Sequence, residues 1–475
     1  MVFLILILGL MATILTVFQG YFAIFVACAV GSAGGLWILY SLLTGRQKTR
    51  LTSLLAAALL VGFCGGVLTT QITNGLAGQN GLALIQAPQL WIAYALVLAL
   101  AASACLLIAS SFEPALVQPR HIVEISWRQE RFLRVAAIIT IAAFARGVLS
   151  YGGAANQAGT LKNDVLATLA EILSACILPL AAIGIVQASG WRRIQFVVIT
   201  VVGFLGLVPI GRRAVVYGLY LAIYAALRLS GRQFNLSAAR KTLLTASTLV
   251  VIVVSSYVFL GIRLAAAQMG SGRFTIAAIL KFAEDDVFTA PRVVAAALNQ
   301  NLQSRPMNLA RYLALLARGG DTPSPMYGKD TAQGVKQAIP DVVYRYFGAN
   351  KSEVRAVSTE EGVANEHFGL PIYDDANSIL SGGIIDLGLA GVLIFPLLIC
   401  AVWRLLLFCL DQVLNAEGQV VAILAALGIF IQSEVSIAGY IVQMRNLVTL
   451  LAMWGVVYWL PRLTGRRQEV PAFSG

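Results

Sequence analysis

The sequence is poor in charged residues, and this scarcity limits the class of protein it can encode. Only 12% of its 475 residues are Asp, Glu, Lys or Arg, whereas soluble domains carry roughly twice that fraction. Hydrophobic residues make up 59% of the chain. Apolar stretches recur at about 17–25 residues, the length at which an α-helix crosses a bilayer. We therefore expect an all-α polytopic membrane protein.

The sequence also lacks the short motifs of several enzyme classes. It contains no Cys-x-x-Cys pair, no Cys/His metal spacing, no G-x-S-x-G elbow, no H-E-x-x-H and no P-loop. All six cysteines fall within expected membrane spans, so they cannot form a disulfide in an external loop. We expect neither a metal nor a cofactor.

A cleavable signal peptide is not expected either. Residues 1–17 are apolar but have no basic n-region and no good cleavage site, so they are interpreted as a retained first helix. About twelve spans are predicted on length and apolarity. Their approximate bounds are 2–18, 21–43, 51–70, 90–110, 135–151, 165–188, 196–210, 214–229, 242–262, 378–408 (with an interfacial start), 420–440 and 447–460.

Lysine and arginine gather in alternate loops. They occur in 46–50, 120–134, 192–193, 228–241 and 462–467, whereas the opposite loop 71–89 has none and 152–164 has only Lys162. Because positive charge marks the cytoplasmic side, both termini are expected in the cytoplasm. The long polar segment that precedes the last three spans is then external.

That segment divides the chain into a bundle over 1–262, an external module over 263–377, and a second bundle with a cytoplasmic tail over 378–475. The module holds 12 basic and 12 acidic residues, so the net charge of +12 arises elsewhere. The excess lies in cytoplasmic loops, where it indicates topology and contact with membrane lipid rather than nucleic acid.

We expect the external module to be mostly helical. Apolar periodicity covers 274–283 and 287–299, and a further helix over 308–318 should lie at the membrane interface or cap a cavity. Residues 321–348 contain several turn formers and 358–377 are interpreted as irregular loop, where binding groups often concentrate.

Charged residues within or at the ends of spans are expected to face a cavity or a partner. All but Arg404 fall in the outer half of the bundle, which indicates a polar chamber open to the outside. The alternative is that Arg146–Glu171 and Glu434–Arg445 are structural ion pairs. The full set is Arg146, Glu171, Arg212, Arg213, Arg263, Asp386, Arg404, Glu434 and Arg445.

Arg212 and Arg213 follow Gly211 at a turn between two spans, where paired guanidinium groups suit a diphosphate. Simple snorkelling to the interface is the alternative. His367 is the one histidine of the external module and a candidate general base. An ordinary surface histidine is the alternative, and Asp374 or Asp375 could orient or replace it.

Two local patterns resemble those of Wzy-type bacterial polysaccharide polymerases and the related O-antigen ligases. Gly211-Arg-Arg-Ala-Val is similar to a G/S-x-R pattern that opens a helix in these families. Residues 377–391, Asn-Ser-Ile-Leu-Ser-Gly-Gly-Ile-Ile-Asp-Leu-Gly-Leu-Ala-Gly, are similar to their closing signature after the large loop. Ligase-like sequences often have His directly before the Asn, but here Ala376 occupies that position, which favours a polymerase.

The resemblance implies glycan transfer between polyprenyl-diphosphate-linked repeat units at the outer face of a bacterial inner membrane, with a chain-length regulator protein as a further partner. Arginines would bind the diphosphate: Arg212, Arg213 and Arg146, then Arg263 and Arg445. His367 or Asp374 would deprotonate the acceptor hydroxyl. Asn377 and Asp375 would position the loop or sugar.

Four other functions remain open from the sequence, one of which is a membrane-bound assembly or scaffold protein. An O-antigen ligase would use the same donor, and a lipid-linked-sugar glycosyltransferase has a similar number of spans. The latter usually carries an acidic residue in its first external loop, and neither 19–20 nor 71–89 has one. A flippase or transporter is the non-enzyme alternative, but it needs polar residues that reach the cytoplasmic half.

Overall fold

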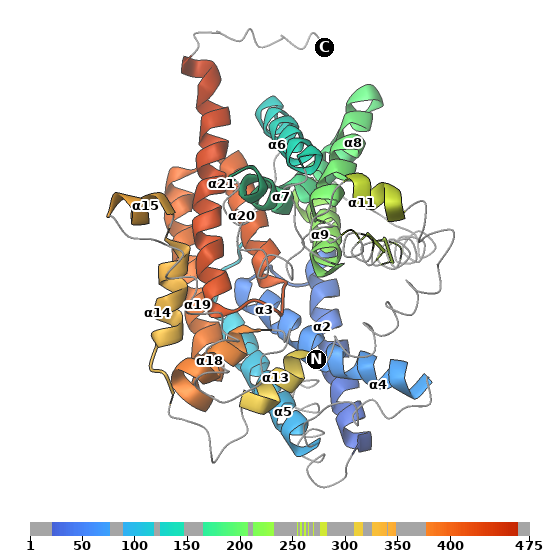
Figure 1. Ribbon diagram of the computed structural model, residues 1–475, viewed down its shortest axis with the longest axis vertical. Helices are drawn as coiled ribbons and strands as arrows, with labels where there is room; N and C mark the ends of the chain where they lie inside the picture. The colour runs from blue at the N-terminus through green and yellow to red at the C-terminus, as the bar shows by residue number, and fades with distance from the viewer. Residues whose placement is uncertain are drawn as a thin grey trace.

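The computed structural model describes residues 21–76, 89–117, 124–146, 165–207, 212–231, 276–282, 308–316, 325–339, 341–347 and 377–463, with isolated residues between 254 and 269. Every element in this part of the chain is a helix, which confirms the all-α prediction (Figure 1). The first helices are α2 (Tyr21–Thr44), α3 (Leu51–Leu59), η1 (Leu60–Gly65), α4 (Gly66–Leu76), α5 (Gln89–Ser110), α6 (Trp127–Ala145), α7 (Val165–Gln187), α8 (Gly190–Leu207), α9 (Arg212–Tyr224) and η4 (Ala225–Leu229). The remainder are α11 (Ile276–Lys281), α13 (Asn308–Leu316), α14 (Lys329–Ala338), α15 (Asp341–Tyr346), α18 (Ile379–Leu387), η7 (Gly388–Ala390), α19 (Gly391–Val413), α20 (Ala416–Phe430) and α21 (Ile437–Leu463).

Six helical segments in the described residues are long and apolar enough to cross a membrane: Ile24–Thr44, Leu51–Ile72, Ile92–Ser110, Gly190–Leu207, Ile379–Val413 and Ile437–Val457. Three shorter apolar helices occur at Ile172–Gln187, Ala214–Leu229 and Ala416–Phe430. The predicted span 2–18 and most of 242–262 lie outside the described residues. The chain is compatible with a multi-pass membrane protein, but the predicted number of about twelve spans is not confirmed.

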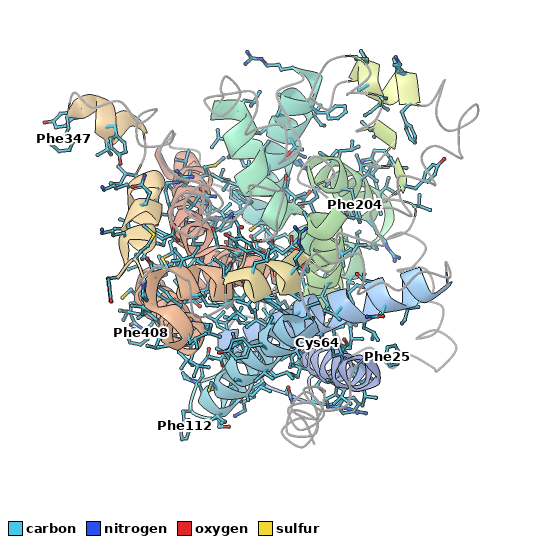
Figure 2. All side chains as sticks on the ribbon, turned by 60° about the horizontal axis from the view of Figure 1, so that its bottom comes forward. Phe25, Cys64, Phe112, Phe204, Phe347 and Phe408 are labelled. Atoms are coloured by element: carbon cyan, nitrogen blue, oxygen red, sulfur yellow. The ribbon has the colours of Figure 1, made fainter. Side chains whose placement is uncertain are left out.

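Large apolar side chains on the outside of the bundle support a lipid-facing surface. In α8 and α19 they recur on one face, away from the buried side of each helix, where water would be unfavourable. The exposed members include Val197, Val198, Val201 and Leu205 of α8, and Leu393, Ile394, Leu398, Val402, Leu405 and Phe408 of α19. Figure 2 shows Phe408 on the outside of the bundle.

The last two predicted spans were placed too late in the sequence. The break expected between 440 and 447 lies between Phe430 and Ile437. Ser436 begins α21, because its hydroxyl accepts a hydrogen bond from the amide of Gly439 at 3.1 Å. Residues 431–436 are Ile-Gln-Ser-Glu-Val-Ser, so the polar residues of this break were a local signal in the sequence.

The predicted span 378–408 is two helices in the structure. Ser378 caps α18 through a reciprocal pair of hydrogen bonds with Ser381. The helix ends at Gly388, whose φ of +62° is a conformation that favours glycine. The chain then reverses so closely that a Cβ on Gly391 would lie 1.9 Å from the carbonyl oxygen of Gly383. The expected interfacial start is therefore the separate helix α18.

Helix α13 forms where the sequence predicted a helix, but it does not present an exposed apolar face. The four residues of its predicted apolar face, Leu309, Tyr312, Leu313 and Leu316, are all buried, and none is more than 2% exposed. The helix packs against α4, α5 and α18. It is thus part of the bundle core, and its buried contacts replace the expected position at an interface or over a cavity.

Candidate functional site

The structure describes only part of the predicted site. Four predicted residues lie outside the described part of the chain: Arg263, His367, Asp374 and Asp375. Arg212 and Arg213 are the first two residues of α9, which begins five positions after the end of α8 at Leu207; the predicted turn over 208–211 lies outside the described residues. The structure does not describe their side chains or that of Glu171 in α7.

Arg146 lies at the end of α6 and is exposed. Its backbone amide donates to Ala142 at 3.0 Å. Within the described residues its guanidinium forms no ion pair, and the alternative pairing with Glu171 stays a prediction because that carboxylate is not described.

Residues 325–347, which sequence analysis interpreted as rich in turns, contain the two helices α14 and α15. Gly328 adopts a φ of +86° immediately before α14 and so acts as the turn. Gly334 lies within the helix, where its missing side chain has a packing role. A Cβ at this position would lie only 2.9 Å from the Cβ of Ala438 in α21. The glycines that suggested a loop therefore allow α14 to lie directly against α21.

The N-terminus of α14 is bound by Asp386 of α18. The backbone amides of Asp330 and Thr331 donate to the two carboxylate oxygens at 3.0 and 2.8 Å, and the Thr331 hydroxyl donates to the same carboxylate. Asp386 is fully buried. A carboxylate at this end of a helix satisfies free amides and interacts favourably with the helix dipole. It explains why a charge is retained within an apolar segment.

The C-terminus of α14 is bound by Arg445 of α21. The guanidinium donates from Nη1 to the carbonyl of Ala338 at 3.5 Å and from Nη2 to Asn446 at 2.9 Å. A cation at the carbonyl end complements the dipole just as Asp386 does at the other end. Arg445, a predicted diphosphate ligand, therefore has a structural role in positioning α14.

Asp330 is the second buried acid beside α14, and its side chain is 7% exposed. No described residue donates a hydrogen bond to its carboxylate. Desolvation by burial, followed by repulsion from Asp386, raises its pKa from 3.8 to about 6. Sequence reasoning missed this residue, since only the fold brings it next to Asp386.

Asn377 lies immediately before α18. Its side-chain oxygen is buried and accepts no hydrogen bond from the described residues. Buried polar atoms are rarely left without a partner, so this oxygen is a candidate acceptor for a ligand hydroxyl. For Asn377, the structure thus identifies the side-chain oxygen as the atom available to a ligand.

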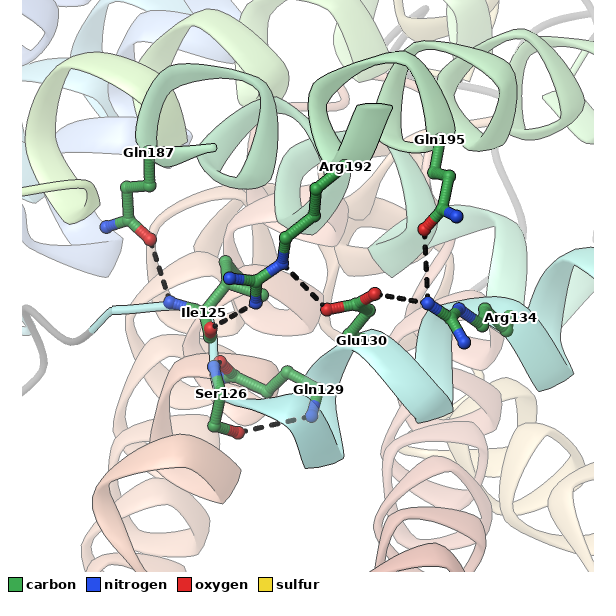
Figure 3. A network of polar contacts seen from close by, with 8 residues as sticks. All are labelled: Ile125, Ser126, Gln129, Glu130, Arg134, Gln187, Arg192 and Gln195. Atoms are coloured by element: carbon green, nitrogen blue, oxygen red, sulfur yellow. Dashed lines mark hydrogen bonds and ion pairs between the residues drawn. The ribbon is translucent and has the colours of Figure 1, made fainter. Parts of the chain in front are cut away.

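Two segments that contain several arginines contact each other, residues 125–134 and 187–195 (Figure 3). Glu130 accepts from Arg192 at 2.9 Å and forms an ion pair with Arg134. Gln187, at the end of α7, accepts from the amide of Ile125 at 2.7 Å. These contacts join the start of α6, and Ile125 just before it, to the end of α7 and the start of α8.

A second group of contacts connects the start of α3 with the segment that follows α5. Glu113 accepts hydrogen bonds from the amides of Leu51 and Thr52 at 3.0 and 3.1 Å, and Arg50 donates to its carbonyl at 2.7 Å. Loops that the charge pattern assigned to one side therefore contact one another.

Comparison with protein-family models, with curated proteins and with solved structures found no match.

Proposed function

We propose that the protein is a polysaccharide polymerase that joins polyprenyl-diphosphate-linked repeat units without a metal. In this proposal the chain lies in a bacterial inner membrane with both termini in the cytoplasm and residues 263–377 at the outer face. The donor and acceptor are both lipid-linked glycans, and a chain-length regulator protein is a further partner. The resemblance of residues 211–215 and 377–391 to the Wzy-type families motivates the proposal.

The observation that carries the proposal is the double role of α18. At one end, Asp386 binds α14 and so attaches the long segment to the bundle. At the other end, Asn377 offers a buried oxygen with no partner among the described residues. A site that joins two glycans needs a fixed wall and hydrogen-bond acceptors for sugar hydroxyls. The attachment of α14 through Asp386 and the Asn377 oxygen without a described partner support the proposal.

The proposed reaction forms one glycosidic bond and breaks one sugar–phosphate bond. The acceptor hydroxyl attacks the anomeric carbon of the donor glycan, and His367 or Asp374 takes the hydroxyl proton. The polyprenyl diphosphate leaves with the electron pair of the broken bond. Arg212 and Arg213, with Arg146, would offset the negative charge that develops on this leaving group.

Reconstituted protein with lipid-linked repeat units tests the proposal. Arg212→Ala and Arg213→Ala should each abolish products longer than the starting unit, because charge on the leaving diphosphate is no longer offset. Asn377→Leu should weaken acceptor use by roughly tenfold, the effect of about 1.4 kcal/mol. The chain-length ladder on a gel and the dependence of rate on acceptor concentration are the measurements.

Arg193→Ala is the matched control, since Arg193 is an exposed arginine near the start of α8. It should retain the full ladder. Wild-type ladders from both Arg212→Ala and Arg213→Ala would refute the diphosphate assignment. Movement of the lipid-linked unit across the vesicle without any lengthening would instead identify a flippase.

A further inference from the structure

Helix α15 carries aromatic side chains that the rest of the described structure leaves uncovered. Tyr346 is 84% exposed and Phe347 is 75% exposed, and their rings contact each other edge to face. Val343, one turn earlier, is 40% exposed. Figure 2 shows Phe347 beyond the end of α14, directed away from the bundle. In water, such a surface would be unfavourable.

The orientation of α15 is set by its contacts with α14. The hydroxyl of Tyr344 donates to the carbonyl of Lys336 at 2.9 Å, which ties α15 to the last turn of α14. Helix α15 runs across the direction of α21, whereas α14 lies alongside α21 (Figure 1). The direction of α15 is that of a helix lying in a bilayer surface.

The contacts between α14 and α21 fix the position of α15 along the axis of α21. Gly334 lies against Ala438, and four residues later Ala338 accepts from Arg445, so the two helices run in the same direction. Lys329 and Lys336 of α14 are both exposed, which places this helix in water or among lipid headgroups rather than in hydrocarbon.

Arg445 marks the edge of the hydrocarbon layer along α21, and the end of α14 lies beside it. It is the last charged residue before the uncharged stretch 446–461. The exposed apolar surface of α21 begins one turn later at Val448, which is 56% exposed. A guanidinium in this place lies at the edge of the hydrocarbon. Because Ala338 is bound to it, α15 begins at the same level.

We propose that α15 is a membrane-interface anchor whose exposed aromatic face, formed by Val343, Tyr346 and Phe347, lies in the boundary between the headgroups and acyl chains of the bilayer. Aromatic residues are enriched at this depth because their rings are apolar while the tyrosine hydroxyl stays hydrated. The occupant of the face is the lipid surface itself. The proposal requires only that the chain spans a membrane and is independent of any glycan chemistry.

A nitroxide at Val343→Cys leaves both aromatic residues in place and reports its depth. The protein would carry Cys409→Ser, since Cys409 is an exposed native cysteine, and would be reconstituted in vesicles of phosphatidylethanolamine and phosphatidylglycerol. Collision rates with oxygen, which concentrates in lipid, are compared with those of a water-soluble nickel chelate. We expect a several-fold higher oxygen-to-nickel ratio at 343 than at Lys329→Cys, and a lower ratio than at Val448→Cys.

Removal of the aromatic side chains provides the second measurement. In the Tyr346→Ser, Phe347→Ser double variant, the ratio at 343 should fall to the value at 329. Val335→Ser is the matched control, because Val335 is a 48% exposed residue of α14, and it should leave the ratio at 343 unchanged. A ratio at 343 equal to that at 329 with the aromatic residues present would overturn the proposal. Low collision rates with both reagents would also overturn it, because a protein partner would then cover the face.

Discussion

At the residue scale, Asp330 and Asp386 lie at the same helix terminus in different environments. Asp386 accepts three hydrogen bonds from the first turn of α14. Asp330 belongs to that first turn, is almost completely buried, and receives no hydrogen bond at its carboxylate from a described residue. The helix dipole favours negative charge here by about 0.3–1 kcal/mol. The raised pKa of Asp330 indicates that desolvation and the neighbouring charge outweigh this contribution.

Asp330→Asn should therefore stabilise the docked position of α14 at alkaline pH. The pKa of Asp330 in the folded protein is about 6, above its ordinary 3.8, so ionisation opposes docking. This opposition is absent below about pH 4, grows between pH 4 and 6, and is complete above pH 6. A shift of this size corresponds to at most about 3 kcal/mol. Hydrogen exchange of the α14 amides should show greater protection than wild type at pH 8 and a much smaller difference near pH 4.

Asp411→Asn is a suitable control for this experiment. Asp411 lies near the end of α19, far along the chain from α18, and its replacement should leave the protection of α14 unchanged at both pH values. Reduced protection of α14 in Asp330→Asn at pH 8 would contradict the assigned direction of the pKa shift, because it would mean that the ionised carboxylate stabilises the helix.

At the element scale, glycines decide how closely two helices approach. The sequence predicted one span over 378–408 with an interfacial start, and the structure has two helices there, α18 and α19. What hydropathy could not predict is the backbone contact between Gly383 and Gly391 that packs α18 on α19. Likewise, Gly334 suggested a turn because glycine is a poor helix former. Its contact with Ala438 overrides that preference.

Gly391→Ala should destabilise the protein. The new Cβ would lie 1.9 Å from the oxygen of Gly383, so α18 and α19 must separate. Overpacking of this kind costs about 1–3 kcal/mol. Gly455→Ala in α21 is the matched control, since a Cβ there meets nothing within 4 Å and alanine is the better helix former. Thermal unfolding in nanodiscs should show a lower midpoint for the first variant only. Equal midpoints would show that α18 can move away without loss.

At the scale of the whole molecule, segments that carry positive charge contact one another in pairs. Glu130 at the start of α6 binds Arg192 at the start of α8, and Glu113 binds the start of α3. Helix α14 is attached instead to Asp386 and Arg445, in the segments that follow the long polar segment. These contacts are consistent with the topology that we propose, in which the positively charged segments are cytoplasmic.

A membrane-impermeant maleimide tests this topology. In the Cys409→Ser background, Lys329→Cys should react in intact spheroplasts because α14 is proposed to lie outside and Lys329 is exposed. Arg193→Cys, also exposed, should react only after the membrane is made permeable. The extent of labelling on each side is measured by mass shift. Reaction of both positions from the same side would contradict the proposed sidedness.

The sequence by itself predicted an all-α chain with several apolar helices long enough to cross a membrane. Apolar length and the scarcity of charge are local properties that require no knowledge of contacts. It predicted the helical nature of the described chain and the individual helix α13, whereas α18 was expected only as the start of one span over 378–408. It failed at the break before α21, where the polar residues 431–436 were a signal in the sequence, and in residues 325–347, where a glycine does not report on its neighbours.

Only the tertiary structure decided the roles of the charged residues at α14. Asp386 lies 55 positions after Thr331, and Arg445 lies 107 positions after Ala338. No periodicity relates residues so far apart. Their pairing depends on how α18 and α21 pack, and the burial created by that packing sets both the hydrogen bonds of Asp386 and the raised pKa of Asp330. The partner of a buried charge is a property of the fold.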